Sequence, residues 1–144
     1  MFIVLLEADP QALWEDLVAK AVAATLNRDE KDLYRKLRKT IEHLQADPRH
    51  PGLQSHEIEI LTKRYGMKIW QSYLENMRAG ARRVFWVYGP QKKEITILAI
   101  ENHPSTSARG YRLIHLPADG AIKRMSTRKK LDAGKVKGSR KRKR

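Results

Sequence analysis

The chain has 144 residues, 41% of them hydrophobic, and a formal net charge of +14. This length is enough for one domain with its own core and too short for two. No stretch approaches the ~18 uninterrupted apolar residues of a membrane span, and without cysteine there is no disulfide scaffold, thiolate metal site or thiol nucleophile. The apolar residues 1–6 lack the basic start of a secretory signal and run directly into Glu7 and Asp9, so we expect a cytoplasmic protein without a membrane partner.

The positive charge is concentrated at the C-terminal end. Residues 123–144 contain 12 Lys or Arg and one acid, Asp132, so they hold +11 of the +14 and leave +3 for residues 1–122. A segment with so many like charges and so little to bury is expected to be a disordered basic tail. Such a tail can contact phosphate backbones nonspecifically through counterion release, or it can serve only solubility. We therefore expect a folded domain in residues 1–122 and a tail in residues 123–144.

The N-terminal part predicts one strand and two helices. Residues 2–6 are an apolar run suited to a strand buried on both faces. Asp9 and Pro10 are residue types preferred at a helix N-cap and first position, and apolar residues follow at spacings of three and four. Asn27 and Glu30 form a candidate capping box that opens a second helix. We expect the two helices to pack together and against one face of a sheet.

A loop should follow the second helix, because the residue that precedes Pro48 is driven out of the helical region. The loop contains His50 and His56. It lacks the compact ligand spacing of zinc sites and has no cysteine partner, so neither a metal nor a cofactor is predicted. The helical Trp14 and His43 are interpreted as core or flanking residues, as is Tyr34.

Residues 67–103 predict a meander of three antiparallel strands. Residues 83–88 alternate two chemically different sets, and residues 94–100 are rich in β-branched types. The loop between them, residues 89–93, has hairpin length, and residues 76–80 suggest a turn after the first strand. The predicted fold class is α+β: a short N-terminal strand, two helices and a small three-stranded antiparallel sheet. The aromatic side chains of the meander are interpreted first as sheet core and cross-strand pairs, and they are Trp70, Phe85, Trp86 and Tyr88.

A resemblance to the RelE/ParE superfamily of toxins from type II toxin-antitoxin pairs is carried by the segments LRKTIEHLQADPRHPGL, SHEI, GMKIW, ARRVFWVYG and ITILAIENH, within residues 35–103. It implies a strand, a helical pair and then an antiparallel meander. It also implies a cognate antitoxin that wraps the basic concave face. Members similar to RelE cleave mRNA on the ribosome without a metal, whereas ParE-like members poison DNA gyrase.

Metal-free RNA cleavage needs a base for the 2′-hydroxyl, cations for the charged pentacovalent state and an acid for the leaving oxygen. By the resemblance, Arg83 falls where the family has an arginine before an apolar strand, and its planar fork could clamp the scissile phosphate. His103 falls where many members carry a basic group, and an imidazole can serve as acid or base. Several relatives place a tyrosine just after the last strand; here Tyr111 could fold back to that place, or Tyr73 could stand in.

Further residues are candidate RNA contacts, although each cation among them could equally be a solvated surface charge. Strict alternation places Arg82 on the sheet face opposite Arg83, so we favour Arg83 as the clamp. The candidate RNA-binding residues are Lys63, Arg64, Lys68, Tyr73, Arg78 and Arg82.

Two functions follow from these residues and the resemblance. The first is a RelE-like, metal-independent and ribosome-associated endoribonuclease that cuts mRNA, contacts ribosomal RNA, inhibits translation and is neutralised by an antitoxin. The second is a non-catalytic protein of the same fold, such as a ParE-like gyrase inhibitor or a nucleic-acid-binding protein.

Overall fold

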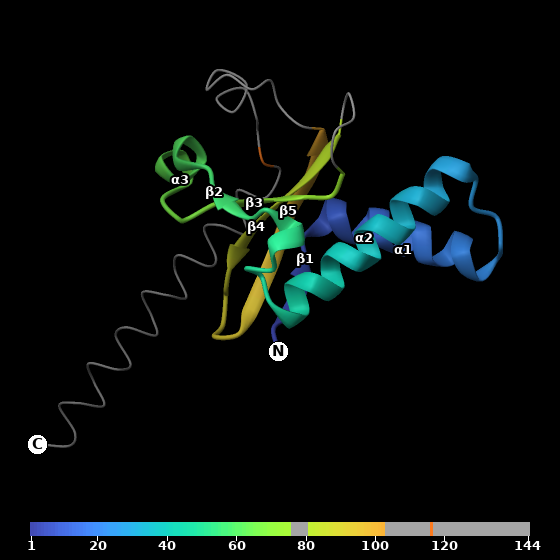
Figure 1. Cartoon of the computed structure of the whole chain (residues 1–144), viewed down its shortest axis with the longest axis horizontal. Helices are drawn as coiled ribbons and strands as arrows, with labels where there is room; N and C mark the ends of the chain where they lie inside the picture. Colours follow the sequence, from blue (N-terminus) through green and yellow to red (C-terminus); the bar gives the residue numbers. More distant parts are fainter. Residues whose placement is uncertain (76–80, 103–115, 117–144) are drawn as a thin grey trace, which may run out of the picture.

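The computed structural model describes residues 1–75, 81–102 and 116 of the chain. These residues form an α+β fold in which three α-helices accompany a five-stranded mixed sheet. Figure 1 shows α1 and α2 side by side on one side of the sheet and α3 on the other. The elements in chain order are β1 (Ile3–Leu6), α1 (Ala8–Val22), α2 (Arg28–Ala46), the 3-10 turn η1 (Pro51–Leu53), β2 (His56–Glu57), α3 (Glu59–Tyr65), β3 (Trp70–Tyr73), β4 (Arg82–Tyr88) and β5 (Glu94–Asn102).

The sheet has five strands in the order β1-β5-β4-β3-β2, so the prediction of a three-stranded sheet is wrong. The predicted antiparallel meander is present as β3, β4 and β5. β1 extends it by pairing in parallel with β5, with Ile3 opposite Glu94, and the two-residue β2 pairs antiparallel with β3. A parallel pair needs a long crossover, so local sequence patterns do not reveal it.

The N-terminal strand was expected to be buried on both faces, and this prediction is also wrong. β1 is an edge strand whose side chains alternate between the two faces of the sheet. Val4 and Leu6 pack into the core under the helices, whereas Ile3 and Leu5 are 59% and 36% exposed. The continuous apolar run of residues 2–6 therefore forms a strand with only one face covered, the face under α1 and α2.

The two long helices start differently. α1 begins at Ala8 after the N-cap Glu7, which makes no side-chain capping bond, so the prediction of Asp9 as N-cap is wrong. The capping box of α2 is confirmed: Asn27 Oδ1 accepts from Glu30 N at 2.8 Å, and Glu30 Oε1 accepts from Asn27 N at 3.1 Å. α2 ends at Ala46, before Pro48, as predicted. Within the described ranges, no helix combines the length and apolar character that a membrane crossing needs.

The sheet separates two hydrophobic cores. Val84 and Trp86 belong to the core under α1 and α2, and Phe85 and Val87 belong to the core under α3, which confirms the predicted alternation in β4. Leu116 also packs in the α3 core, and its backbone N–H donates to the Tyr65 hydroxyl at 3.1 Å. The helices and the sheet thus fix both faces of β4, which carries the candidate clamp.

Aromatic contacts across the strands match the interpretation as core and cross-strand pairs. Trp70 stacks on Trp86 with ring centroids 5.7 Å apart, and Tyr88 meets Trp86 edge-on at 5.0 Å. The buried Trp86 Nε1 donates to Ser72 Oγ at 2.7 Å. On the helices, Trp14 and Tyr34 stack at 5.5 Å and join α1 to α2.

Candidate functional site

Arg83, the predicted phosphate clamp, lies on β4 directly opposite Tyr73 of β3. Its guanidinium carbon is 3.8 Å from the centroid of the Tyr73 ring, and Nη1 donates to the carbonyls of Glu75 at 2.7 Å and Arg82 at 3.1 Å. Arg83 is only 6% exposed, and its Nε has no hydrogen-bond partner among the described residues. The side chain therefore holds the end of the β3–β4 pair while part of its fork stays unsatisfied.

Glu75 organises the charges at this end of the sheet. Its Oε1 accepts from Arg82 Nε at 2.8 Å, and its Oε2 lies 3.2 Å from Lys36 Nζ on α2. Burial works to raise the pKa of the Glu75 carboxyl, but the bonds from Arg82 and Lys36 outweigh burial and lower it. The carboxylate is therefore charged, and it joins α2 to the meander. No local pattern around Glu75 indicates this role, and our sequence analysis missed it.

The predicted RNA contacts near α3 are accessible. Lys63 and Arg64 occupy the last turn of α3, and Lys68 lies between α3 and β3; all three side chains are exposed. Arg83 and Phe85 are two positions apart on β4, so their side chains point to the same face of the sheet, and Phe85 packs in the α3 core. Arg83 and these cations therefore belong to the same side of the sheet. Arg82, by contrast, is engaged by Glu75.

Three predicted site residues lie outside the described residues. They are His103 and Tyr111, both candidates for catalysis, and Arg78, a candidate RNA contact. The predicted turn at residues 76–80 and the predicted tail at residues 123–144 lie outside as well. Within the described ranges, no three His, Asp or Glu side chains come together in a way that could hold a metal ion.

A groove of about 360 Å³, which the sequence did not indicate, lies between the second half of α2, η1 and the end of β3. Tyr73 is among its lining residues, while the alternation along β3 directs the Tyr73 side chain, like that of Arg83, to the face of the sheet that carries α3. Every lining residue that can carry a charge near neutral pH is basic, and the set is Arg35, Lys36, Lys39, His43 and His50. The other lining residues are Thr40, Gly52, Leu53 and Leu74.

Two histidines stack inside this groove. The rings of His43 on α2 and His50 before η1 are 4.0 Å apart between centroids and inclined by 22°. His50 Nδ1 accepts from Gly52 N at 3.0 Å, and a Cβ on Gly52 would lie 3.0 Å from the same nitrogen, so the ring needs glycine there. Burial, followed by the neighbouring His50 and Lys39, lowers the pKa of His43 below 6.5. The lowered pKa means that His43 resists protonation in the stacked pair.

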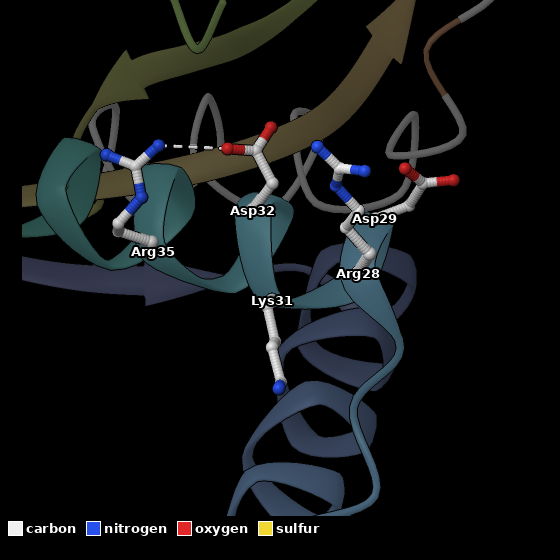
Figure 2. A pocket seen from close by; sticks show the side chains of 5 residues that line it. All are labelled: Arg28, Asp29, Lys31, Asp32 and Arg35. Atoms are coloured by element: carbon white, nitrogen blue, oxygen red, sulfur yellow. Dashed lines mark hydrogen bonds and ion pairs between the residues drawn. The ribbon is translucent and has the colours of Figure 1, made fainter.

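A larger hollow of about 640 Å³ lies over the first half of α2, and its charges are mixed. It is lined by Arg28, Asp29, Lys31, Asp32 and Arg35. Figure 2 shows the guanidinium of Arg35 directed at Asp32, 2.9 Å away, and the Lys31 side chain pointing away from the other four. Because carboxylates lie among its cations, this hollow is less suited to an anion than the smaller groove.

No match to this chain is found among protein-family models, curated proteins or solved structures. The resemblance to RelE/ParE toxins therefore rests on the sequence segments that carry it.

Proposed function

We propose that this chain is a RelE-like toxin that acts on ribosome-bound mRNA, cleaves it without a metal and is neutralised by an antitoxin. β1, α1, α2 and the meander β3-β4-β5 follow the chain order that the resemblance implies, which supports the proposal. The observation that carries it is the pair formed by Arg83 and Tyr73 on adjacent strands. Asn102, the residue just before His103, pairs with Arg82 at the same end of the sheet.

In the proposed reaction, the Arg83 guanidinium, whose Nε–H has no partner among the described residues, stabilises the charge that develops on the scissile phosphate. His103 supplies the proton transfer, because an imidazole can act as acid or base near neutral pH. Tyr73, or Tyr111 in its place, stacks on a base or donates through its hydroxyl. The exposed Lys63 and Lys68 contact ribosomal RNA through its phosphates.

One observation favours a second candidate, a non-catalytic protein of the same fold. Arg83 is only 6% exposed, and its Nη1 donates hydrogen bonds to two backbone carbonyls. The side chain therefore stabilises the fold without any substrate. In this candidate, Arg83 maintains the end of the meander. The protein then acts by binding alone, as a ParE-like gyrase inhibitor or a nucleic-acid-binding protein.

Purified protein incubated with translating ribosomes separates the two candidates. For the nuclease, mapping of mRNA 5′ ends shows specific cuts that disappear in His103→Ala and in Arg83→Ala. Arg38→Ala is the control, because Arg38 is an exposed cation on α2 that pairs with Glu42 at 3.5 Å. Intact mRNA together with inhibited DNA supercoiling by gyrase would support the second candidate. Cuts that persist in both variants would remove Arg83 and His103 from the mechanism.

A further inference from the structure

Three of the groove cations lie on one face of α2. Arg35, Lys39 and His43 are spaced by four residues, which brings successive side chains to the same helix face about 6 Å apart along the axis. Asp32 pairs with Arg35 at 2.9 Å, and Asp32 and Glu75 pair with Lys36 at 2.7 and 3.2 Å. Lys39 is exposed and has no ion pair among the described residues. Its charge and the protonation state of His43 therefore set the charge of the groove.

The histidine pair supplies hydrogen-bond donors to the same groove. Because Nδ1 of His50 accepts from Gly52 N, the proton of the neutral ring is on Nε2, which is a donor. The stacked imidazoles also present aromatic surface in the groove. Cations together with flat rings are the combination that proteins use to hold single-stranded nucleic acid, with phosphates on the cations and bases on the rings.

We propose that the groove between α2, η1 and β3 binds a phosphodiester group of single-stranded RNA, with Lys39 as the permanent charge, His43 as a protonatable contact and Nε2 of His50 as a hydrogen-bond donor. The choice of RNA rests on the proposed function and on the stacked histidine rings that lie beside the cations of the groove. An acidic protein segment would use the cations and leave the rings without a partner.

Protonation links this site to pH. The charged or titratable groups that act on His43 are His50 and Lys39, which oppose its protonation, and Glu42, which favours it. From β3 the groove receives Tyr73, and the nearby Glu75 already has its charge paired with Lys36 and Arg82. A bound phosphate adds negative charge beside His43 and favours its protonated form. RNA binding therefore takes up a proton and strengthens as the pH falls from about 7.5 to about 5.5.

The test measures binding of a fluorescently labelled oligouridylate to the full chain by anisotropy, at several salt concentrations and at both pH values. Lys39→Gln should weaken binding several-fold and reduce the salt slope by about 1, as expected for one lost phosphate contact. Lys31→Gln is the matched control, because it removes the same charge from an exposed position on the same helix outside the groove. His43→Gln should lose the pH dependence, because the amide side chain can still donate a hydrogen bond but cannot take up the proton.

The proposal is overturned if Lys39→Gln and Lys31→Gln weaken binding equally, or if His43→Gln keeps the pH dependence of the parent. Polyglutamate is also added as a competitor. If it displaces the RNA from the wild type and from Lys39→Gln at the same concentration, the RNA does not depend on Lys39, and the groove is not its binding site. Cleavage by the parent protein is measured separately. If no mRNA is cut but Lys39→Gln still weakens binding, the proposed nuclease function is wrong and the proposed RNA site in the groove stands. If Lys39→Gln changes neither cutting nor binding, only the proposed RNA site is wrong.

Discussion

Arg83 and Tyr73 face each other across the β3–β4 pair, and the guanidinium carbon lies 3.8 Å from the centroid of the tyrosine ring. Nη1 of the same arginine donates to the Glu75 carbonyl at 2.7 Å. A cation–π contact stabilises more when the cation is shielded from water than when it is exposed. A hydrogen bond from a charged donor likewise contributes more than one from a neutral donor. Arg83 is thus a structural residue, whether or not it also meets a phosphate.

The first prediction concerns this pair. Tyr73→Leu removes the ring under a buried cation and should lower the free energy of unfolding by about 2 kcal/mol, whereas Tyr73→Phe keeps the ring and should change it little. Arg83→Ala should cost more, because it also leaves the Glu75 carbonyl without its donor. Urea unfolding followed by tryptophan fluorescence measures all three. Equal stability of Tyr73→Leu and Tyr73→Phe would show that the stacking contributes nothing.

Glu75→Gln should destabilise the protein by about 3 kcal/mol near neutral pH, because Arg82 and Lys36 would lose a buried carboxylate partner. The pKa of Glu75 is lowered in the folded state, so its contribution is present above the ordinary value of 4.5 and is lost as the pH falls through the folded value. The variant should therefore lose less stability than the parent on acidification below about pH 4.5.

Denaturant unfolding at a series of pH values measures this difference. Glu42→Gln is the control: its carboxylate lies on α2, pairs with Arg38 at 3.5 Å and has a side chain that is 62% exposed. It should change stability by less than about 1 kcal/mol. A Glu75 variant with the same acid dependence as the parent would contradict the assigned role.

The elements set by local chemistry could be predicted from the sequence. Asn27 and Glu30 satisfy each other's backbone within one helical turn, and the alternation in β4 follows from a period of two, so both predictions are confirmed. The alternation fails in β5, where the register shifts opposite Phe85 and Trp86 and both Leu98 and Ala99 enter the α3 core. A bulge of this kind depends on the partner strand, and no count along one strand predicts it.

The candidate site was predicted less completely, because its contacts connect distant elements. Lys36 and Glu75 are 39 positions apart and meet only after α2 has packed on the sheet. His43 and His50 stack because the chain turns sharply after α2. The helical spacing of His43 alone indicated only a core or flanking residue. The parallel contact of β1 with β5 likewise needs the whole intervening chain.

His43 makes folding sensitive to mild acid. Burial, His50 and Lys39 lower its pKa in the folded state, so the unfolded chain takes up the proton more readily. Stability should therefore fall as the pH drops below the ordinary value of 6.5, and His43→Gln should lose less stability over that interval. Thermal unfolding at about pH 7.5 and about pH 5.5 measures the difference. Identical slopes for the parent and the variant would exclude His43 as the source of the acid sensitivity.

The basic tail predicted at residues 123–144 provides the last prediction. Because it holds +11 of the net +14, its removal should lower nonspecific affinity for nucleic acid and make log K less dependent on log salt. The midpoint of thermal unfolding should stay unchanged, since so polar a segment has little to contribute to a core. The difference between Lys39→Gln and Lys31→Gln should survive in the shortened chain, because both lysines lie on α2. If the shortened chain binds RNA as tightly and with the same salt slope, the tail is not a contact surface, and the affinity belongs to the domain in residues 1–122.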